Sequence, residues 1–419
     1  MTRELEPPLS YTLTRRRLLQ AGGLLLVSPF LALREASAGA PAPRLTRFEL
    51  IPIRATSRTV WLVVRLHTDA GLTGLGEASD AFGFANTTAA NADTMRARLQ
   101  TFFELVRGGS PLDVERYRQR GIPMVKGDLV SATAFSAIEQ AMWDLAGKAL
   151  NVPTHVLFGG KVRAVLPVYA NINRATNPRT PEGFAGAARR AVKDGFRSIK
   201  AAPWDGFPAT GSPAKVIDAA VDAGIAAVVA MREAAGTDID IMVDCHSFFD
   251  VERAVAVARR LEPQRLRWYE EPVAPERVDE TVAIKGRIQQ PMAGGEVLFG
   301  VAGFAPLYQR RAVDVIMPDV KHCGGLLELT RIAAAAEAAG VMVSPHNPSG
   351  PVSTAASVQV AAGMGNFNSL ELQYGEVDWR GELLAPIERF VNGQIAVPDR
   401  PGFGIALNEQ AIRRRALAL

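Results

Sequence analysis

Six acidic or histidine residues recur at a nearly constant spacing through the second half of the chain, each at the end of a short apolar run. In chain order they are Asp244, Glu270, Glu296, Asp319, His346 and Glu371. Successive members lie about 23 to 27 residues apart, a length that one strand, one helix and two loops occupy together. Chance polar residues at strand ends would not keep this phase, so the spacing predicts a repeated strand-helix unit.

Eight short apolar strands are predicted from Pro167 onward, and amphipathic, alanine-rich segments separate them. In order they are PVYAN, RSIKA, DIMVD, LRWYE, PMAGGE, VDVIMPD, VMVSPH and SLELQ. This alternation is typical of βαβ units and a parallel sheet. Eight parallel strands close a TIM-type (β/α)8 barrel of the α/β class, whose active sites lie at the C-terminal ends of the strands. We therefore expect the polar strand ends to converge at one mouth.

The part of the chain before the barrel predicts a small α+β unit. The run TVWLVVRLHTDAGLTGLGEAS alternates in polarity and turns at Asp69-Ala70-Gly71, which predicts an antiparallel hairpin. Helices are expected at about 89–106 and 129–150. This unit is predicted to be distinct from the barrel, because its strands pair antiparallel through a tight turn, whereas the barrel strands are parallel.

Residues 1–40 are predicted to lie outside both units and resemble a twin-arginine export signal. Arg15 and Arg16 precede an apolar run at about 21–33, and Ala36-Ser37-Ala38 follows it. The run is too short to span a bilayer. We expect export to the periplasm, with no membrane attachment after signal removal. The alternatives are an uncleaved tail or a mis-chosen start codon, which leave the protein cytoplasmic.

The overall composition narrows the classes of partner. The chain has 419 residues and a formal net charge of +4, and its Lys and Arg residues are scattered rather than clustered. This pattern argues against a nucleic-acid surface or a polybasic membrane patch and makes a small molecule the expected partner. The two cysteines, Cys245 and Cys323, offer no disulfide framework.

Three carboxylates from consecutive strands predict a metal site. Asp244, Glu270 and Glu296, held about 4 Å apart, would repel one another by roughly 4 kcal/mol per pair at an effective dielectric constant near 20. A cation must therefore lie between them, and an all-oxygen set favours Mg²⁺ first and Mn²⁺ second. In an extended strand His246 shares a face with Asp244, while Cys245 points the other way.

The order of these residues and motifs resembles the enolase superfamily, in its mandelate racemase/muconate lactonizing enzyme branch. The motifs are YEEP, GGE, PDVKHCGG and SPHNPSGP, after the Asp of DIMVD. The resemblance implies a capping domain at 41–165, a barrel at 166–383, and a C-terminal segment at 384–419 that includes VPDRPGFGI and returns to the capping domain. It also implies a Mg²⁺-dependent enzyme, which we expect to be a homo-oligomer.

The family's shared chemistry is abstraction of the proton α to a carboxylate, giving an enediolate that the metal stabilises. The resemblance implies that His346 is the base, that Asp319 orients it, and that Glu371 hydrogen-bonds the enediolate. Lys200 would balance the carboxylates or bind the substrate carboxylate. Racemases of the family carry a second lysine where Ala202 stands here, so a two-base racemase is disfavoured.

His246 points to one group within the family. Asp-x-His at the third strand resembles the acid-sugar dehydratases of the D-galactonate type, in which this histidine protonates the departing β-hydroxyl. The implied reaction converts a sugar acid to a 2-keto-3-deoxy sugar acid. Glu271 is expected to be a hydrogen-bond partner rather than a ligand. Weaker candidates for contact with the substrate are Asn171, Arg54, Arg58, His322 and Lys321.

Two other functions stay open from the sequence. One is a racemase, epimerase or cycloisomerase that acts on another carboxylate without eliminating water. The other is a non-catalytic periplasmic protein that binds sugar acids. This function is less favoured, because binding alone does not need the proton-transfer pair of Asp319 and His346.

Overall fold

Eight parallel strands form a ring from residue 165 onward, in a computed structural model that describes residues 42–82, 88–125 and 127–417. The strands are β4 Val165–Asn171, β5 Ser198–Ala201, β6 Asp240–Asp244, β7 Trp268–Glu270, β8 Met292–Gly294, β9 Val315–Ile316, β10 Met342–Val343 and β11 Leu370–Gln373. All eight predicted strands are present, and they pair in the order β10-β9-β8-β7-β6-β5-β4-β11. The expected export signal, 1–40, lies outside the described residues.

Irregular backbone joins the two ends of this strand order. Val343 on β10 donates its N–H to Asn366 O (2.9 Å) and accepts from Asn368 N (2.8 Å), just before β11 begins. A parallel bridge also links Val343 to Phe367. The strands therefore close into a barrel, as the sequence predicts.

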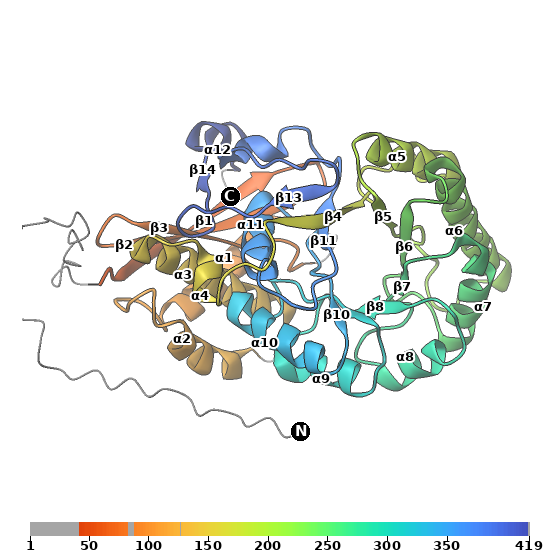
Figure 1. The fold of residues 1–419 in the computed structure, drawn as a ribbon, viewed down its shortest axis with the longest axis horizontal. Coiled ribbons are helices and arrows are strands. Elements are labelled where there is room, and N and C mark those ends of the chain that lie inside the picture. Colours follow the sequence, from red (N-terminus) through yellow and green to blue (C-terminus); the bar gives the residue numbers. More distant parts are fainter. Residues whose placement is uncertain (1–41, 83–87, 126, 418–419) are drawn as a thin grey trace, which may run out of the picture. The chain divides into compact units, whose positions relative to one another are not determined.

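One helix follows each barrel strand except the last in the described chain. The helices are α5 Pro181–Lys193, α6 Ala214–Ala235, α7 Val251–Leu261, α8 Val278–Lys285, α9 Gly300–Gln309, α10 Gly325–Ala338 and α11 Pro351–Ala361. Figure 1 shows α5 to α10 on the outside of the ring of strands. After β11 the chain forms the short 3₁₀ turn η3, Arg380–Leu383, and then the C-terminal segment, which takes the place of the eighth helix of a complete (β/α)8 repeat.

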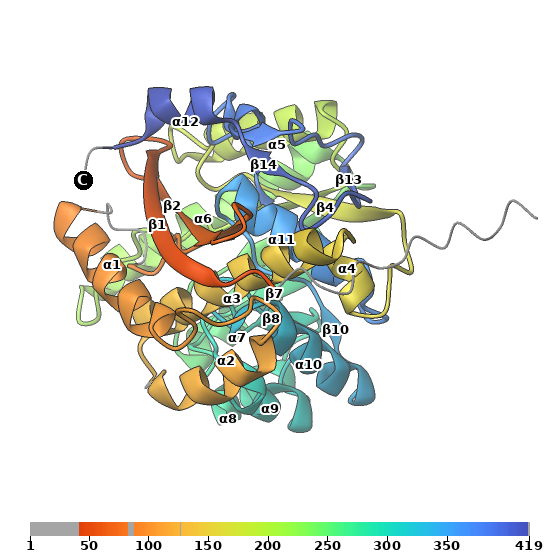
Figure 2. The same ribbon diagram turned by 90° about the vertical axis from the view of Figure 1, so that its left-hand side faces the viewer.

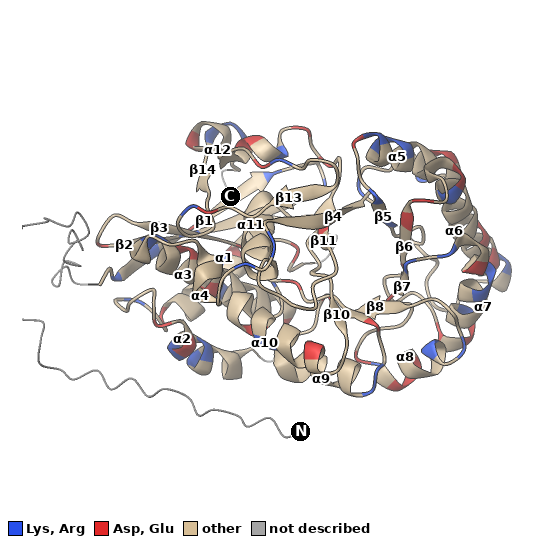
Figure 3. Cartoon of the chain, viewed as in Figure 1, with Lys and Arg blue, Asp and Glu red and all other residues tan. Residues whose placement is uncertain are grey.

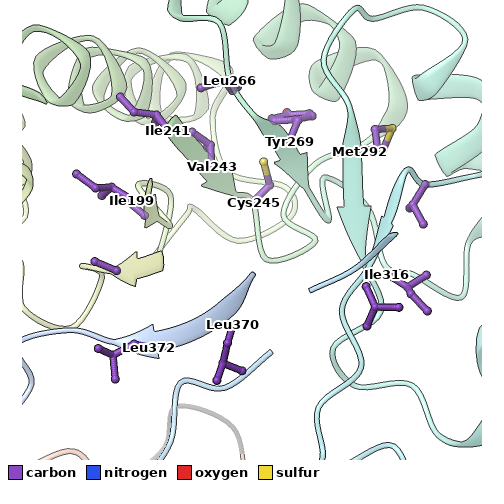
Figure 4. Packing of buried hydrophobic residues seen from close by; sticks show 14 of the residues in the cluster. Ile199, Ile241, Val243, Cys245, Leu266, Tyr269, Met292, Ile316, Leu370 and Leu372 are labelled. Carbon is purple, nitrogen blue, oxygen red and sulfur yellow. The ribbon is translucent and has the colours of Figure 1, made fainter. Parts of the chain in front are cut away.

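Barrel strands are buried on both faces, and their side chains alternate between two cores. Ile241, Val243 and Cys245 point outward from β6 into the core between strands and helices, where Tyr269 joins them (Figure 4). Met242 belongs to a smaller cluster on the opposite face. Asp244 has the same strand parity as Met242 and therefore faces the barrel interior. Cys245 is buried and free, as expected.

A three-stranded antiparallel sheet begins the capping domain. Its strands are β1 Leu45–Arg54, β2 Val60–Thr68 and β3 Thr73–Glu77. The predicted hairpin joins β2 to β3, and Gly71 in its turn has a φ of 77°. The described helices are α1 Ala89–Phe103, α2 Val114–Gly121, α3 Leu129–Leu150 and α4 Thr154–Leu157, with the 3₁₀ turn η1 at Ile122–Met124. Both expected helices are present, whereas α2 was not predicted.

The sheet lies directly against α3 because β3 contains glycine at the contact. A Cβ atom on Gly76 would come within 2.1 Å of the Ala137 carbonyl oxygen, and one on Gly74 within 2.2 Å of the Ala141 carbonyl oxygen. No larger residue fits at this separation. The close approach positions the C-terminal end of β3 near the barrel mouth.

The C-terminal segment returns to the capping domain after contacting the barrel. It contains β12 Leu384–Ala385, β13 Gln394–Ala396, β14 Ala406–Leu407 and α12 Glu409–Arg415. β13 pairs antiparallel with the start of β4. Gly402 bonds the backbone between α3 and α4, and α12 packs beside β1, which Figure 2 shows.

Buried carboxylates of the capping domain accept hydrogen bonds from the rest of the fold. Glu77 accepts from two backbone N–H groups at the start of α11, and Glu139 from two at the start of α10, over 2.7 to 2.9 Å. Asp144 accepts from Phe403 N at 2.7 Å. Helix N-termini have unpaired N–H groups and favour negative charge. Burial raises the pKa of Glu139 to about 8. These contacts fix the capping domain on the barrel mouth.

Charges of both signs are mixed on the outer helices, as Figure 3 shows along α5 to α8. This agrees with the scattered charges of the sequence and gives no single-sign surface over those helices. Within the described residues, no helix is both long enough and apolar enough to cross a membrane.

Candidate active site

Three carboxylates meet at the C-terminal ends of neighbouring barrel strands. Asp244 ends β6, Glu270 ends β7 directly beside it in register, and Glu296 follows β8. One oxygen from each of the three lies within 4.8 Å of the others. Asp244 and Glu270 are buried, whereas Glu296 is half-buried beside a cavity of about 170 Å³. The predicted ligand set is therefore assembled in space.

The chemistry of these donors fits a hard divalent cation. The group contains carboxylate oxygens only, with no thiolate or imidazole, and this is the set that Mg²⁺ and Mn²⁺ prefer. Burial, together with the neighbouring Asp244 carboxylate, raises the pKa of Glu270 well above its ordinary value. Without a cation, the negative charge of the carboxylates is therefore not fully compensated, and the group could hold a metal ion.

Lys200 supplies one positive charge to this cluster. It lies on β5 with its side chain buried, and its Nζ is 2.6 Å from Glu270 Oε1, 3.1 Å from Glu371 Oε1 and 3.4 Å from Asp244 Oδ2. Burial would lower the pKa of Lys200, but the carboxylates of Glu270 and Glu371 outweigh it and hold the pKa well above its ordinary value. Of the two sequence interpretations, the structure places Lys200 among the carboxylates.

His346 follows β10 and is held on its Nδ1 side by an aspartate. Its Nδ1 lies 2.8 Å from Asp319 Oδ2, and its Nε2 lies 3.1 Å from Glu296 Oε2. Burial would raise the pKa of Asp319, but Lys321, His322 and His346 together outweigh it and hold the pKa well below its ordinary value. An ionised Asp319 accepts a hydrogen bond from Nδ1, and Nε2 faces the carboxylate group.

Glu371 lies on β11 between Lys200 and His346. One of its oxygens accepts from Asn171 Nδ2 at 2.7 Å, and the other accepts from Asn347 N at 3.1 Å. Burial would raise the pKa of Glu371, but Lys200 and then His346 hold it below its ordinary value. Asn171 therefore positions Glu371 at the site, and it also lines the 170 Å³ cavity.

His246 meets Asp244 through a turn rather than through strand alternation. β6 ends at Asp244, and His246 has a left-handed backbone with a φ of 43°, so the prediction of a shared strand face was wrong in its cause. Asp244 Oδ1 accepts from His246 N at 3.0 Å, which folds the chain back. The two side chains then lie 3.1 Å apart, from His246 Nε2 to Asp244 Oδ2.

Asp205, which the sequence interpretation missed, holds the other side of this histidine. Its Oδ1 lies 2.5 Å from His246 Nδ1. Asp205 comes from the loop after β5, five positions after Lys200, and this polar residue just beyond a strand end was the one signal that could have found it. Burial would lower the pKa of His246, but Asp244 and Asp205 hold it well above its ordinary value.

The two histidines flank the carboxylates from opposite sides. His246 follows β6 and His346 follows β10, which lie four strands apart in the ring of eight. Each imidazole has an aspartate on Nδ1 and a carboxylate of the predicted ligand set within 3.1 Å of Nε2. The arrangement presents two proton-carrying groups to one small cavity.

Neighbours of these groups have supporting positions. Glu271 accepts from Gly295 N at 2.6 Å and Glu296 N at 3.3 Å, so it orders the turn after β8, as expected of a hydrogen-bond partner. His322 lines the cavity, and burial lowers its pKa to about 4, which keeps it neutral. Lys321 is buried against Asp319 instead of reaching the cavity.

A larger cavity of about 430 Å³ continues outward from the first one. Both cavities are lined by Asp80, Asn173 and Arg174. Arg54 is exposed at the end of β1 and is not among the residues that line either cavity, and its contact with the substrate stays a prediction. Arg58 on the following loop does line the outer cavity.

Family models match almost the whole described chain. Residues 44–159 match the mandelate racemase / muconate lactonizing enzyme N-terminal domain, and residues 183–411 match the enolase C-terminal domain-like model. These two matches cover the capping sheet with its helices and the barrel with its returning segment.

Similar proteins agree with this match. The chain is 32% identical over 364 residues to D-xylonate dehydratase of Haloferax volcanii, which covers 84% of each chain. It is 29% identical to D-galactonate dehydratase of Ralstonia pickettii, over 89% of this chain and 94% of that one. The structure of a mandelate racemase/muconate lactonizing enzyme from Jannaschia sp. CCS1 superimposes with a TM-score of 0.78 at 28% identity, covering 90% of this chain and 98% of that one. The chain therefore belongs to the mandelate racemase/muconate lactonizing enzyme branch of the enolase superfamily.

Proposed function

We propose that the protein is a Mg²⁺-dependent acid-sugar dehydratase, which removes water from a sugar carboxylate to give a 2-keto-3-deoxy sugar acid. The observation that carries this proposal is the pair of histidines on opposite sides of one carboxylate group, each held by its own aspartate. Elimination of water needs a base for the α-proton and an acid for the β-hydroxyl, and these two positions supply both. The dehydratases among its relatives support the same reaction class.

Asp244, Glu270 and Glu296 would hold the metal ion in this proposal. A bound Mg²⁺ would supply the charge stabilisation for the oxyanion that forms when the α-proton leaves. Lys200 compensates part of the charge of the surrounding carboxylates, and Glu371 lies beside His346 with Nε2···Oε2 at 3.9 Å. To hydrogen-bond the reacting carboxylate group, Glu371 must carry a proton when the substrate is bound.

His346 is the base in this proposal. Asp319 holds Nδ1, so the α-proton goes to Nε2, the nitrogen that faces the metal-ligand carboxylates. His346 then carries a positive charge next to Asp319, which stabilises the imidazolium and raises the basicity of the ring.

His246 is the acid. It donates a proton from Nε2 to the β-hydroxyl as the carbon–oxygen bond breaks, and the hydroxyl leaves as water. The substrate therefore loses a proton from the α-carbon, which His346 takes, and a hydroxyl group from the β-carbon. Asp205 orients the imidazole from Nδ1 and keeps it protonated until it is needed. The enol that remains tautomerises to the 2-keto acid.

The alternative functions are less well supported by the same geometry. A two-base racemase needs a second base after β5, and Ala202 stands there in place of a lysine. A sugar-acid binding protein would have no use for two aspartate-held histidines at one cavity. An epimerase that uses His246 as its second base can be distinguished by its product, because it would form an epimer of the substrate and no 2-keto acid.

The proposal is tested by incubating the purified protein and Mg²⁺ with a panel of aldonates and aldarates, with detection of 2-keto acids. At least one acid should be dehydrated. The His246→Asn variant should lose dehydration by about 10²- to 10⁴-fold, the contribution of a positioned acid, yet keep exchange of the α-proton with deuterated water. A panel in which the protein epimerises acids and forms no 2-keto acid would replace this proposal with the epimerase.

We further propose that residues 1 to about 38 direct export by the twin-arginine route to the periplasm. Replacing Arg15 and Arg16 with lysine should retain the protein in the cytoplasm, whereas an arginine-to-lysine change at Arg47, an exposed residue of β1, should not. Fractionation of cells that express each variant measures this. Equal periplasmic accumulation of the double variant would contradict the assignment. The expected homo-oligomer also stays a prediction.

A further inference from the structure

The outer cavity joins the capping domain to the barrel beyond the reacting groups. Its walls come from the loop at 56–59, between β1 and β2, and from the loops that follow β4, β5 and β11. Its volume, about 430 Å³, exceeds the 170 Å³ of the inner cavity and falls in the range of small-molecule sites. A substrate whose reacting carbons occupy the inner cavity therefore extends its far end into the outer one.

Around Arg174 the outer cavity carries more negative than positive charge. Arg174 lies 3.2 Å from Asp80 and 3.3 Å from Glu376, so its single positive charge faces two carboxylates. Glu376 is 3% exposed, and its Oε2 has no hydrogen-bond partner among the described residues. A buried carboxylate oxygen at a cavity wall requires a donor, and a hydroxyl group of the ligand supplies one.

Two arginines line the outer cavity and not the inner one. They are Arg58 and Arg179, and the carboxylate that lies nearest Arg179 in the described chain is Asp205, which lines the same cavity and lies 3.6 Å away. Asp205 is already engaged by His246 and by Asn173 Nδ2 at 2.6 Å. Burial and the cation of Arg58 lower the pKa of Arg179, and Asp205 opposes this shift. Both guanidinium groups thus belong to the lining of one cavity.

Neutral groups hold Arg179 in place. Its Nη1 donates to Asn173 Oδ1 at 2.9 Å, its Nη2 donates to the Ala202 carbonyl at 2.6 Å, and its guanidinium carbon lies 5.1 Å from the Phe184 ring centroid. These contacts fix the direction of the guanidinium group without neutralising it. A fixed, partly exposed arginine beside a second arginine is the arrangement that binds a carboxylate or a phosphate.

We propose that the substrate carries a second anionic group at the end remote from the reacting carboxylate, and that Arg58 and Arg179 bind it. The inference rests on the proposed dehydratase function and specifies its substrate class. The second group is either the terminal carboxylate of an aldarate or the phosphate ester of a phosphorylated aldonate, which present the same oxyanion chemistry. The hydroxyl groups between the two ends face Glu376 and Arg174.

The test compares matched acids that differ only at the far end. D-gluconate, D-glucarate and 6-phospho-D-gluconate form one set, and D-galactonate and galactarate form another. We expect kcat/KM to be about 10- to 100-fold higher for at least one doubly anionic acid than for its matched aldonate, the factor of a hydrogen-bonded charge pair. A preference for an aldarate would identify the second group as a carboxylate, and a preference for 6-phospho-D-gluconate would identify it as a phosphate ester.

Variants then assign the effect to the two arginines. Arg58→Gln should lower kcat/KM by about 10- to 100-fold for the doubly anionic acid and by clearly less for the matched aldonate, which lacks the second anion. Arg179→Gln should lower the value for both acids, with the larger loss for the doubly anionic one, because Arg179 also lies 3.6 Å from Asp205. Arg47→Gln, at an exposed arginine of β1, is the matched control and should change neither value. Arg58 is exposed, so its variant should fold even if Arg179→Gln does not.

The outcomes separate this inference from the proposed function. Efficient dehydration of aldonates alone, or an Arg58→Gln variant that lowers the values for both acids equally, would overturn the second-anion assignment and leave the dehydratase intact. Failure of every acid in both sets would overturn the dehydratase proposal, and the inference with it.

Discussion

Replacing His346 with asparagine should abolish both the dehydration of the substrate and the exchange of its α-proton with deuterated water. Asparagine keeps a polar group near Asp319 but has no nitrogen that can accept a proton. The chain offers no substitute base on the opposite side, because Ala202 stands where racemases of the family have a lysine. The loss should reach about 10²- to 10⁴-fold, the contribution of one positioned base. Stopped assays for 2-keto acid and proton NMR in deuterated water measure the two effects.

Two further variants make this result interpretable. His67→Asn changes a histidine of β2 in the capping sheet, and it should leave both readings close to the wild type. His246→Asn should lose dehydration while exchange continues, because it removes the acid and not the base. Exchange that persists in His346→Asn and disappears in His246→Asn would instead reverse the two roles.

Replacing Glu270 with glutamine should raise the Kd for Mg²⁺ by more than about 100-fold. The substitution removes one of three carboxylates that lie within 4.8 Å of one another but keeps the shape of the side chain. Residues that only orient metal ligands already contribute about 10- to 100-fold, so loss of a ligand should exceed that range. Isothermal calorimetry with Mg²⁺, or electron paramagnetic resonance with Mn²⁺, measures the affinity, and the wild type should bind one ion per chain.

Glu271→Gln is the matched control because it changes the next residue in the chain. Glu271 accepts backbone N–H bonds from the turn that carries Glu296, so its variant should lose affinity by no more than about 100-fold. Lys200 lies 2.6 Å from Glu270 and would move closer to the other carboxylates once Glu270 is neutral. Wild-type affinity in Glu270→Gln would remove this carboxylate from the proposed ligand set.

The barrel and its polar strand ends could be predicted because both depend on short-range patterns. Each strand is an apolar run of a few residues, and the spacing of Asp244, Glu270 and Glu296 reports one strand-helix unit at a time. The register that places Asp244 beside Glu270 follows from this spacing. The closure between β10 and β11 was predicted, but its form was not, because it uses irregular backbone around Phe367 that has no strand pattern.

The contacts between loops could not be predicted from spacing alone. His246 reaches Asp244 through a left-handed turn, and strand alternation suggested the same neighbour for a different reason. Asp205 lies in a loop after another strand, so its contact with His246 exists only once the barrel has closed. Arg54 was selected because it lies in an early loop of the capping domain, but position in the chain does not indicate which side chains of a loop face a cavity.

The return of the chain end to the capping domain constrains when the protein can fold. Asp144 is fully buried in α3, and one of its partners, Phe403 N, lies 259 residues later, close to the C-terminus. Until the segment around Phe403 docks, this carboxylate keeps Lys148 Nζ at 2.6 Å and Leu75 N at 2.9 Å but lacks its third partner, and an unfilled acceptor position on a buried carboxylate is costly. The glycine contact between β3 and α3 can form before that segment arrives, but the capping domain is complete only when the segment has docked. The parts of the capping domain that precede and follow the barrel in the chain therefore become native together.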